Sequence, residues 1–354
     1  KYITTIRYEN IGENVARAYP SLGMNLRCPD ENIILQTIGH LENILHFFCL
    51  YCVSFHLSNV SVLKSRYGPR REIGNIVRLI FCSVLGNHLA SQSLQQQMYN
   101  HENLIVANEF LRWGSSSDVA AGKLKLAAFY LALGQLDTME DVLQHVGANF
   151  NEFVFEQGDK VIPRITLSKI LYENLSAEQF IKECVALMVC YSPSDIHSIP
   201  KVLIFEIFRS TGSELSVDMT PSVALNVVAV KARIYLYFLQ YQCFLRQGRV
   251  ADRLAALNKM LLVIKDYYHK LFDTIESMTI ILQRLYLRTL MSESLGYVTT
   301  SLNLMSYCLK QDGRPIDAFK VLCLSMKLKI QHNAAKWQIS ACISSSMRNL
   351  SDRQ

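Results

Sequence analysis

The stretch from Leu302 to Met326 constrains the fold of this chain most, because it has the pattern of two helices joined by a tight turn. Gly313 suits the left-handed conformation that ends a helix, and Pro315 suits the first helical position, where its missing N–H is not needed. In both halves apolar or small residues recur at helical spacing, namely Leu302, Met305, Ser306 and Leu309, then Ala318, Leu322 and Ser325. The sequence therefore predicts a helical hairpin with Gly313 and Pro315 as its turn residues.

Two weaker copies of this pattern occur earlier in the chain, around Gly134 and Gly248. Each of these glycines also separates two segments of helical periodicity. A regular tetratricopeptide array repeats about every 34 residues, whereas the three glycines are unevenly spaced. About twelve helices and no extended sheet are expected along the chain. We therefore predict an all-α fold of irregular helical hairpins, stacked as a tetratricopeptide-like α-solenoid.

Breaks in the helical periodicity divide the chain into three parts. Helical spacing returns over residues 73–98, 102–113 and 167–189, and again from Val223 to Gln247. Between Gly147 and Thr166 it disappears, and a loop or short strands are expected around Phe155. Prolines at positions 193, 200 and 221 mark the main boundary. The predicted division is an N-terminal helical region (1–147), a connecting segment (148–222) and a tetratricopeptide-like domain (223–354).

Composition excludes general disorder, since half of the 354 residues are apolar and 19% are charged. The net charge of +6 is spread along the chain and does not form a nucleic-acid signature. The ten cysteines lie mostly within apolar runs, where a free thiol acts as a small hydrophobe. This usage favours a reducing compartment, and the charged first ten residues do not resemble a signal peptide. We therefore expect a cytoplasmic protein.

A stretch without formal charge between Glu42 and Lys64 raises the alternative of a membrane span. Polar residues interrupt it repeatedly, so a buried helix is preferred and no membrane span is favoured. The same stretch contains His46, Cys49, Cys52 and His56 on one side of the expected helix. Ten residues of helix span about 15 Å, so four such ligands cannot close around one zinc ion. Ordinary helix packing is the preferred interpretation, and no metal is expected.

Catalytic motifs are missing from the sequence. Gly114 and Ser115 suggest the turn of a nucleotidyltransferase, but that chemistry needs two carboxylates spaced two residues apart, and no Asp or Glu pair has this spacing. The loop Ser115–Asp118 is instead expected to cap a helix. The chain also lacks a phosphate-binding loop, a Gly-x-Ser-x-Gly elbow and a His-Glu-x-x-His pair. We expect no enzymatic activity and no cofactor.

Two further features have alternative interpretations. Arg70, Arg71 and Arg78 are candidates for a small basic patch that meets an acidic partner, although a solvated helix end explains them equally well. Trp113 and Trp337 are expected to anchor the core and not to stack on a ligand.

The sequence also resembles a known family. The turns at Gly248 and Gly313 are similar to the tetratricopeptide consensus. The run Lys123–Gly134, the segment His88–Ser93 and the segment His332–Trp337 resemble the C-terminal helical region of molluscan proteins of the male-abnormal-twenty-one (cGAS-like) family. The resemblance covers residues 74–343. In that family a nucleotidyltransferase-like domain precedes the helical region, but the required acid-x-acid pair is absent here, so no catalytic residue carries over.

Three functional hypotheses follow. The first is a non-enzymatic helical-repeat scaffold that binds a protein or peptide on its concave surface. The second, which the resemblance implies, is the C-terminal part of a cGAS-like nucleotidyltransferase or nucleic-acid sensor. The third is a helical protein anchored to a membrane near residues 42–64.

Overall fold

The computed structural model describes residues 70–95, 101–157, 173, 175–209, 227–276, 297–328 and 333–341. The uncharged stretch and its histidine and cysteine residues lie outside this part of the chain. Helices account for 76% of the described residues, which confirms the predicted all-α class. The solenoid arrangement of the hairpins stays a prediction.

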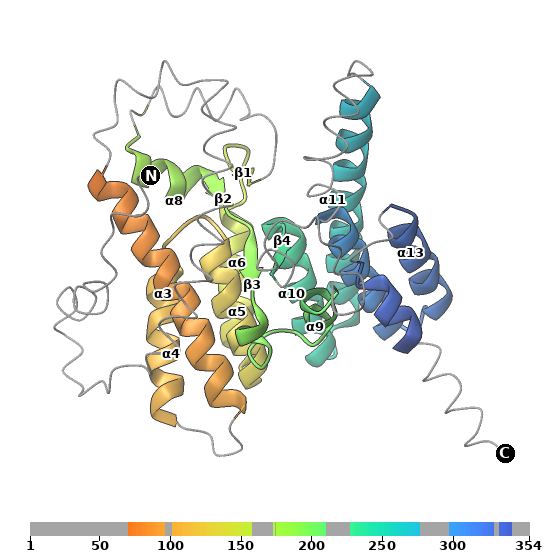
Figure 1. Cartoon of the computed structure of the whole chain (residues 1–354), viewed down its shortest axis with the longest axis horizontal. Coiled ribbons are helices and arrows are strands. Elements are labelled where there is room, and N and C mark those ends of the chain that lie inside the picture. The colour runs from red at the N-terminus through yellow and green to blue at the C-terminus, as the bar shows by residue number, and fades with distance from the viewer. Residues whose placement is uncertain are drawn as a thin grey trace, which may run out of the picture.

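The helices pack as hairpins beside one another, from α3 and α4 at one side of the molecule to α13 at the other (Figure 1). Within the described residues α3 pairs with α4, α5 with α6, and α10 with α11, while α6 also packs against α10. Two further helical segments cover residues 297–311 and 335–341. The bounds are α3 Arg70–Gln95, α4 His101–Gly114, α5 Ala121–Leu133, α6 Leu136–Asn149, α8 Ala177–Cys184, α9 Val202–Ile207, α10 Ala232–Arg246, α11 Val250–Glu276 and α13 Pro315–Leu328.

The three predicted glycine turns are confirmed. Gly134, Gly248 and Gly313 have φ values of 74°, 74° and 73°. At Gly313 the N–H donates to the carbonyl of Lys310, and the next N–H, from Arg314, donates to that of Leu309. The other two turns repeat this pair of bonds, which is the Schellman motif that satisfies the last carbonyls of a helix. Pro315 is the first residue of α13, as predicted.

Replacement of Gly313 by valine is expected to lower the free energy of unfolding by about 1 kcal/mol or more, because a β-branched residue is poorly tolerated at positive φ. No atom outside the turn lies within 4 Å of the added Cβ, so the cost is conformational and not steric. Urea unfolding measures the change in the free energy of unfolding. Gly313→Asn is the control and should lose less, since asparagine tolerates the left-handed region. Equal stability of the valine variant and the wild type would contradict the assigned turn.

Short strands occupy places where helix was predicted, and these predictions are wrong. The helix expected over residues 167–189 contains α8 but ends at Cys184 and is followed by β2 (Val185–Ala186) and β3 (Val189–Tyr191). The helix expected from Val223 begins only at Ala232, after β4 (Val228–Val230). A short apolar run that is buried on both faces has the same pattern in a strand as in a buried helix, which explains the error.

These strands form two small sheets. β1 (Phe155–Glu156) pairs in parallel with β2, which confirms the expected short strand around Phe155. β3 pairs antiparallel with β4, with Cys190 opposite Ala229. The pairing of β3 with β4 joins the segment before α9 to the segment before α10.

One hydrophobic core runs through the described residues, from Ile76 on α3 to Ala318 on α13. Hydrogen bonds also link α10 to its neighbours: the Tyr241 hydroxyl donates to the Cys308 carbonyl at 2.7 Å, and Arg246 Nη1 donates to the Leu131 carbonyl at 2.7 Å. The six described cysteines are free thiols, and five of them are buried. Burial raises the pKa of Cys82 to about 12, which fits a packing role. The predicted domain division stays a prediction.

Candidate functional site

The loop between α4 and α5 is organised by the buried carboxylate of Asp118. Its Oδ2 atom accepts N–H bonds from Ala121 and Leu187, both at 2.9 Å, and Oδ1 accepts one from Gly122 at 3.2 Å. The Ala120 N–H and the Ser117 hydroxyl also donate to it. Asp118 therefore caps the first turn of α5 and holds the chain after β2 against it. The predicted capping role of this loop is confirmed.

His88, Ser192 and Asp195 form a second buried polar group between α3 and the 3-10 turn Pro193–Asp195. His88 Nε2 lies 3.3 Å from both the Ser192 hydroxyl and Asp195 Oδ1. The Ser192 hydroxyl and N–H both lie within bonding distance of Asp195 Oδ2, at 3.1 and 2.7 Å. The same nitrogen of His88 therefore contacts both Ser192 and Asp195. In a Ser-His-Asp catalytic triad one ring nitrogen contacts the serine and the other contacts the aspartate. Burial lowers the pKa of His88, which favours its neutral form. The group acts as a structural clamp.

Lys125 on α5 lies beside a small cavity of about 30 Å³. The side chain is only 4% exposed, and its Nζ atom lies 5.6 Å from the centre of the Tyr191 ring. Burial lowers the pKa of the amine, although Asp195, Cys190 and Asp118 act in the opposite direction. The cavity wall is formed by Ile80, Ser83, Ser117, Ala121, Gly122, Lys125, Gln157, Leu187, Met188 and Cys190.

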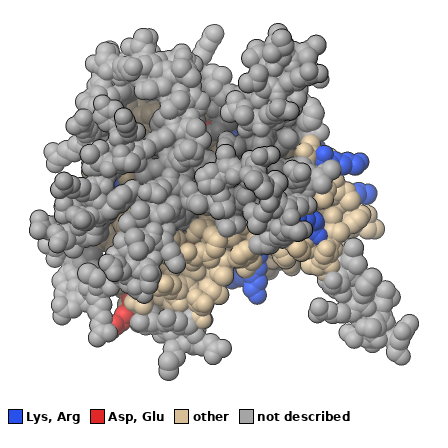
Figure 2. All heavy atoms as spheres, in the orientation of Figure 1, with Lys and Arg blue, Asp and Glu red and all other residues tan. Residues whose placement is uncertain are grey.

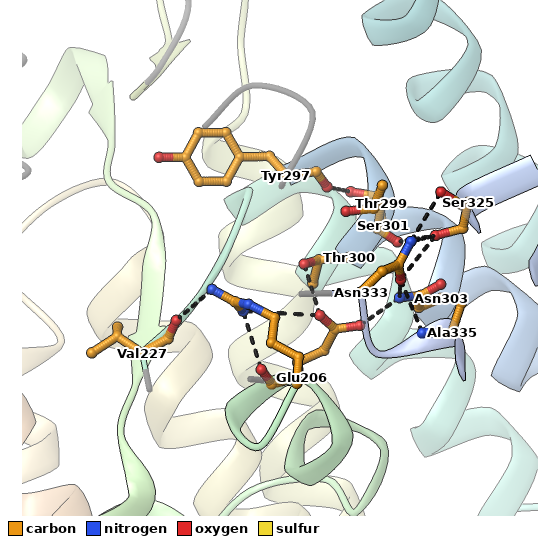
Figure 3. A network of polar contacts seen from close by, with 11 residues as sticks. Glu206, Val227, Tyr297, Thr299, Thr300, Ser301, Asn303, Ser325, Asn333 and Ala335 are labelled. Carbon is orange, nitrogen blue, oxygen red and sulfur yellow. Dashed lines mark hydrogen bonds and ion pairs between the residues drawn. The ribbon is translucent and has the colours of Figure 1, made fainter. Parts of the chain in front are cut away.

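A third buried polar network links α9 to the last helical hairpin, which consists of the helix over residues 297–311 and α13. Glu206 lies at the centre of this network (Figure 3). Glu206 accepts hydrogen bonds from Asn303 at 2.7 Å and from Thr300 at 3.1 Å. Arg209 lies 4.0 Å from the carboxylate and donates to the carbonyls of Glu206 and Val227, both at 3.1 Å. The charge of Glu206 is thus compensated inside the protein.

Asn333 extends this network to α13. Its Oδ1 atom accepts from Asn303 at 3.1 Å and from the Ala335 N–H at 2.9 Å, while its amide nitrogen donates to the Ser325 carbonyl at 2.9 Å (Figure 3). The network therefore fixes α13 against the helix over residues 297–311. Like the His88 group, this network consists of hydrogen bonds that hold separate elements together.

The outward face of α13 exposes three large apolar side chains. Ile316, Phe319 and Leu324 are 72%, 49% and 39% exposed. They lie opposite the face formed by Ala318, Leu322 and Ser325, which is buried as the sequence predicted. Lys320 and Lys327 lie on the same side of α13, among these apolar residues, and Arg314 directly precedes the helix. We call the six residues Arg314, Ile316, Phe319, Lys320, Leu324 and Lys327 the α13 face.

The remaining predicted site residues are not brought together. Arg70 and Arg71 open α3, but their side chains lie outside the described residues. Arg78 is half-buried and donates to Asn75 at 3.1 Å, so the basic patch stays a prediction. The Trp113 ring packs edge-on against the Phe110 ring, with the ring centroids 5.5 Å apart. Trp337 is 38% exposed, so the prediction that it anchors the core is wrong.

Sequence reasoning missed the functional candidates that the fold creates. Lys123 and Lys125 are the charged residues in the otherwise apolar α5, and they were the available signal. The described part of the chain contains no cluster of three His, Cys, Asp or Glu residues suited to a metal ion. None of its helices has the length and apolar character that a bilayer span requires.

The fold and these sites define a predominantly helical protein. No protein-family model, curated protein or solved structure matches the chain. The resemblance to the male-abnormal-twenty-one family stays a prediction.

Proposed function

We propose that this chain is a non-enzymatic helical scaffold that binds an amphipathic helix of a partner protein along the α13 face. The main observation behind this proposal is that three large apolar side chains, Ile316, Phe319 and Leu324, are exposed on one side of one helix. Large exposed apolar patches mark interaction sites, and an apolar stripe on a helix is suited to a second helix.

The charges around this stripe indicate which partner it suits. Arg314, Lys320 and Lys327 are the exposed basic residues of the α13 face. Asp317, the acidic residue of α13, is 2.8 Å from the Arg314 guanidinium, and the net charge of the region stays positive. Basic side chains are also visible toward the side of the molecule where α13 lies (Figure 2). A partner helix with an apolar stripe and acidic residues at its edges would complement both features.

The buried polar groups support a scaffold over an enzyme. His88, Asp195 and Glu206 are the kinds of residue that carry acid–base chemistry, but each is enclosed and occupied in holding two elements together. The α13 face, by contrast, is positioned by the Asn333 network and open to a partner. The buried free thiols suit a reducing compartment, and we propose a cytoplasmic location.

A binding assay with a defined probe tests this proposal. The probe is a synthetic amphipathic helix with leucines on one face and glutamates at the edges, labelled for fluorescence anisotropy. We expect saturable binding that Phe319→Asp weakens about tenfold or more, because truncating a central aromatic anchor typically costs more than 1 kcal/mol. Leu262→Asp is the control, since Leu262 is an exposed apolar side chain on a different helix, α11.

The outcomes separate this function from others. Equal weakening by the two aspartate variants, or equal affinity for a probe with lysines at its edges, would indicate nonspecific apolar adhesion and overturn the proposal. Preferential binding of double-stranded DNA or RNA with a steep salt dependence would favour the nucleic-acid sensor instead. Binding to anionic vesicles without binding to the peptide would favour a membrane-associated protein.

A further inference from the structure

We propose that the cavity beside Lys125 is a covalent site, at which the Lys125 amine forms an imine with a short-chain aldehyde. This inference is independent of the α13 face and concerns the opposite half of the fold.

The geometry of the Lys125 amine is unusual for a buried cation. Among the described residues it makes no hydrogen bond and no ion pair, and its Nζ atom lies 5.6 Å from the centre of the Tyr191 ring. The hydroxyl of Ser83, in the same cavity wall, is buried and has no hydrogen-bond partner within the described part of the chain. Buried polar groups without partners are rare in folded proteins. Both groups are therefore available to a molecule in the cavity.

The size of the cavity limits the ligand to a small molecule. Its volume of about 30 Å³ exceeds the roughly 10–15 Å³ that one water requires. Two or three non-hydrogen atoms fit, as in formaldehyde or acetaldehyde, whereas an aromatic aldehyde does not. Apolar side chains, including Ile80, Leu187 and Met188, cover much of the wall and suit the alkyl end of such a molecule.

Burial of Lys125 favours the free amine before reaction, and the nearby carboxylates would partly offset the cost of burying a cation after it. Enclosure lowers the pKa of the amine, so more of it is unprotonated near neutral pH than for a surface lysine. The groups near Lys125 are the carboxylates of Asp195 and Asp118, the Cys190 thiol, the Tyr191 ring and His88. The two carboxylates lie too far away to form ion pairs with Lys125, but they would stabilise a positive charge placed there.

The reaction needs no oxidant or reductant. The Nζ lone pair attacks the carbonyl carbon and forms the C–N bond. The two amine protons are transferred to the carbonyl oxygen, the C–O bond breaks, and water leaves. The resulting imine binds a proton from solvent, and the iminium charge then lies near Asp195 and against the Tyr191 ring. Cys190 lines the same cavity, but burial raises the pKa of its thiol to about 11, so it stays protonated and is the weaker nucleophile.

Reductive trapping tests the proposal on the full chain. The protein is treated at pH 6 with acetaldehyde and cyanoborohydride, and the rate of ethylation of each lysine is measured by peptide mass spectrometry. Because the lowered pKa leaves more of the Lys125 amine unprotonated at this pH, we expect Lys125 to be labelled severalfold faster than the exposed Lys320. The difference should vanish in denaturant, where both amines are solvated.

Lys123 is the matched control because burial also lowers the pKa of its amine, but that amine donates to the Asp118 and Val119 carbonyls. It does not line the cavity and should react more slowly than Lys125. Benzaldehyde should label Lys320 but leave Lys125 intact, because it exceeds the cavity. Labelling of Lys125 no faster than Lys320, or labelling without size selection, would overturn the proposal. These measurements use the wild-type chain and do not depend on a variant that folds.

Discussion

Replacing Gly122 with alanine is expected to lower the free energy of unfolding by more than about 3 kcal/mol. A Cβ atom at this position would overlap the Gly114 carbonyl oxygen, which is backbone and cannot rotate away. Gly114 cannot shift in turn, because its own α-carbon packs against Ser83, where an added Cβ would lie 2.5 Å from the Ser83 nitrogen. The two glycines thus let α4, α5 and α3 meet at backbone distance.

Chemical unfolding followed by circular dichroism measures this effect. Gly74→Ala is the matched control, since Gly74 lies within α3, is exposed and has no atom within 4 Å of an added Cβ. Alanine at Gly74 is expected to stabilise the chain by roughly 0.5–1 kcal/mol through helix propensity. If Gly122→Ala unfolds at the same denaturant concentration as the wild type, the close approach of α5 to the end of α4 is wrong.

Replacing Asp118 with alanine is expected to cost about 3–5 kcal/mol. The substitution leaves the buried N–H groups of Ala121, Gly122 and Leu187 without their acceptor, and each unsatisfied donor costs about 1–3 kcal/mol. The negative charge at the N-terminus of α5 is lost as well, which removes a favourable interaction with the helix dipole. The loss should appear in thermal and urea unfolding alike.

Asp317→Ala provides the comparison for Asp118→Ala. Asp317 is also near a helix start and also makes hydrogen bonds, but its partner is the exposed Arg314 side chain. Surface pairs of this kind contribute about 0–1 kcal/mol, so a small change is expected. Similar losses in the two variants would mean that Asp118 is a solvated cap and does not hold buried amides.

Local signals were sufficient for the helical hairpins of this chain. A glycine between two periodic segments predicted the turns at Gly134, Gly248 and Gly313, because each helix end needs a left-handed residue whatever surrounds it. The buried face of α13 followed from the spacing of Ala318, Leu322 and Ser325 for the same reason. The capping role of the loop that contains Asp118 could also be predicted from the sequence, because a capping side chain bonds to backbone N–H groups only a few residues away.

The strands and the candidate sites depend on contacts between distant segments. Val185–Ala186 and Val228–Val230 become strands because Phe155–Glu156 and Val189–Tyr191 supply backbone partners, and no local pattern specifies such partners. Likewise, sequence alone does not show that Glu206 meets Asn303 or that Lys125 faces Ser83. The sequence by itself determined the all-α class and the glycine turns, which follow from local backbone preferences. Only the tertiary structure decided which charges are enclosed and which face of α13 remains exposed, because burial depends on what packs against each residue.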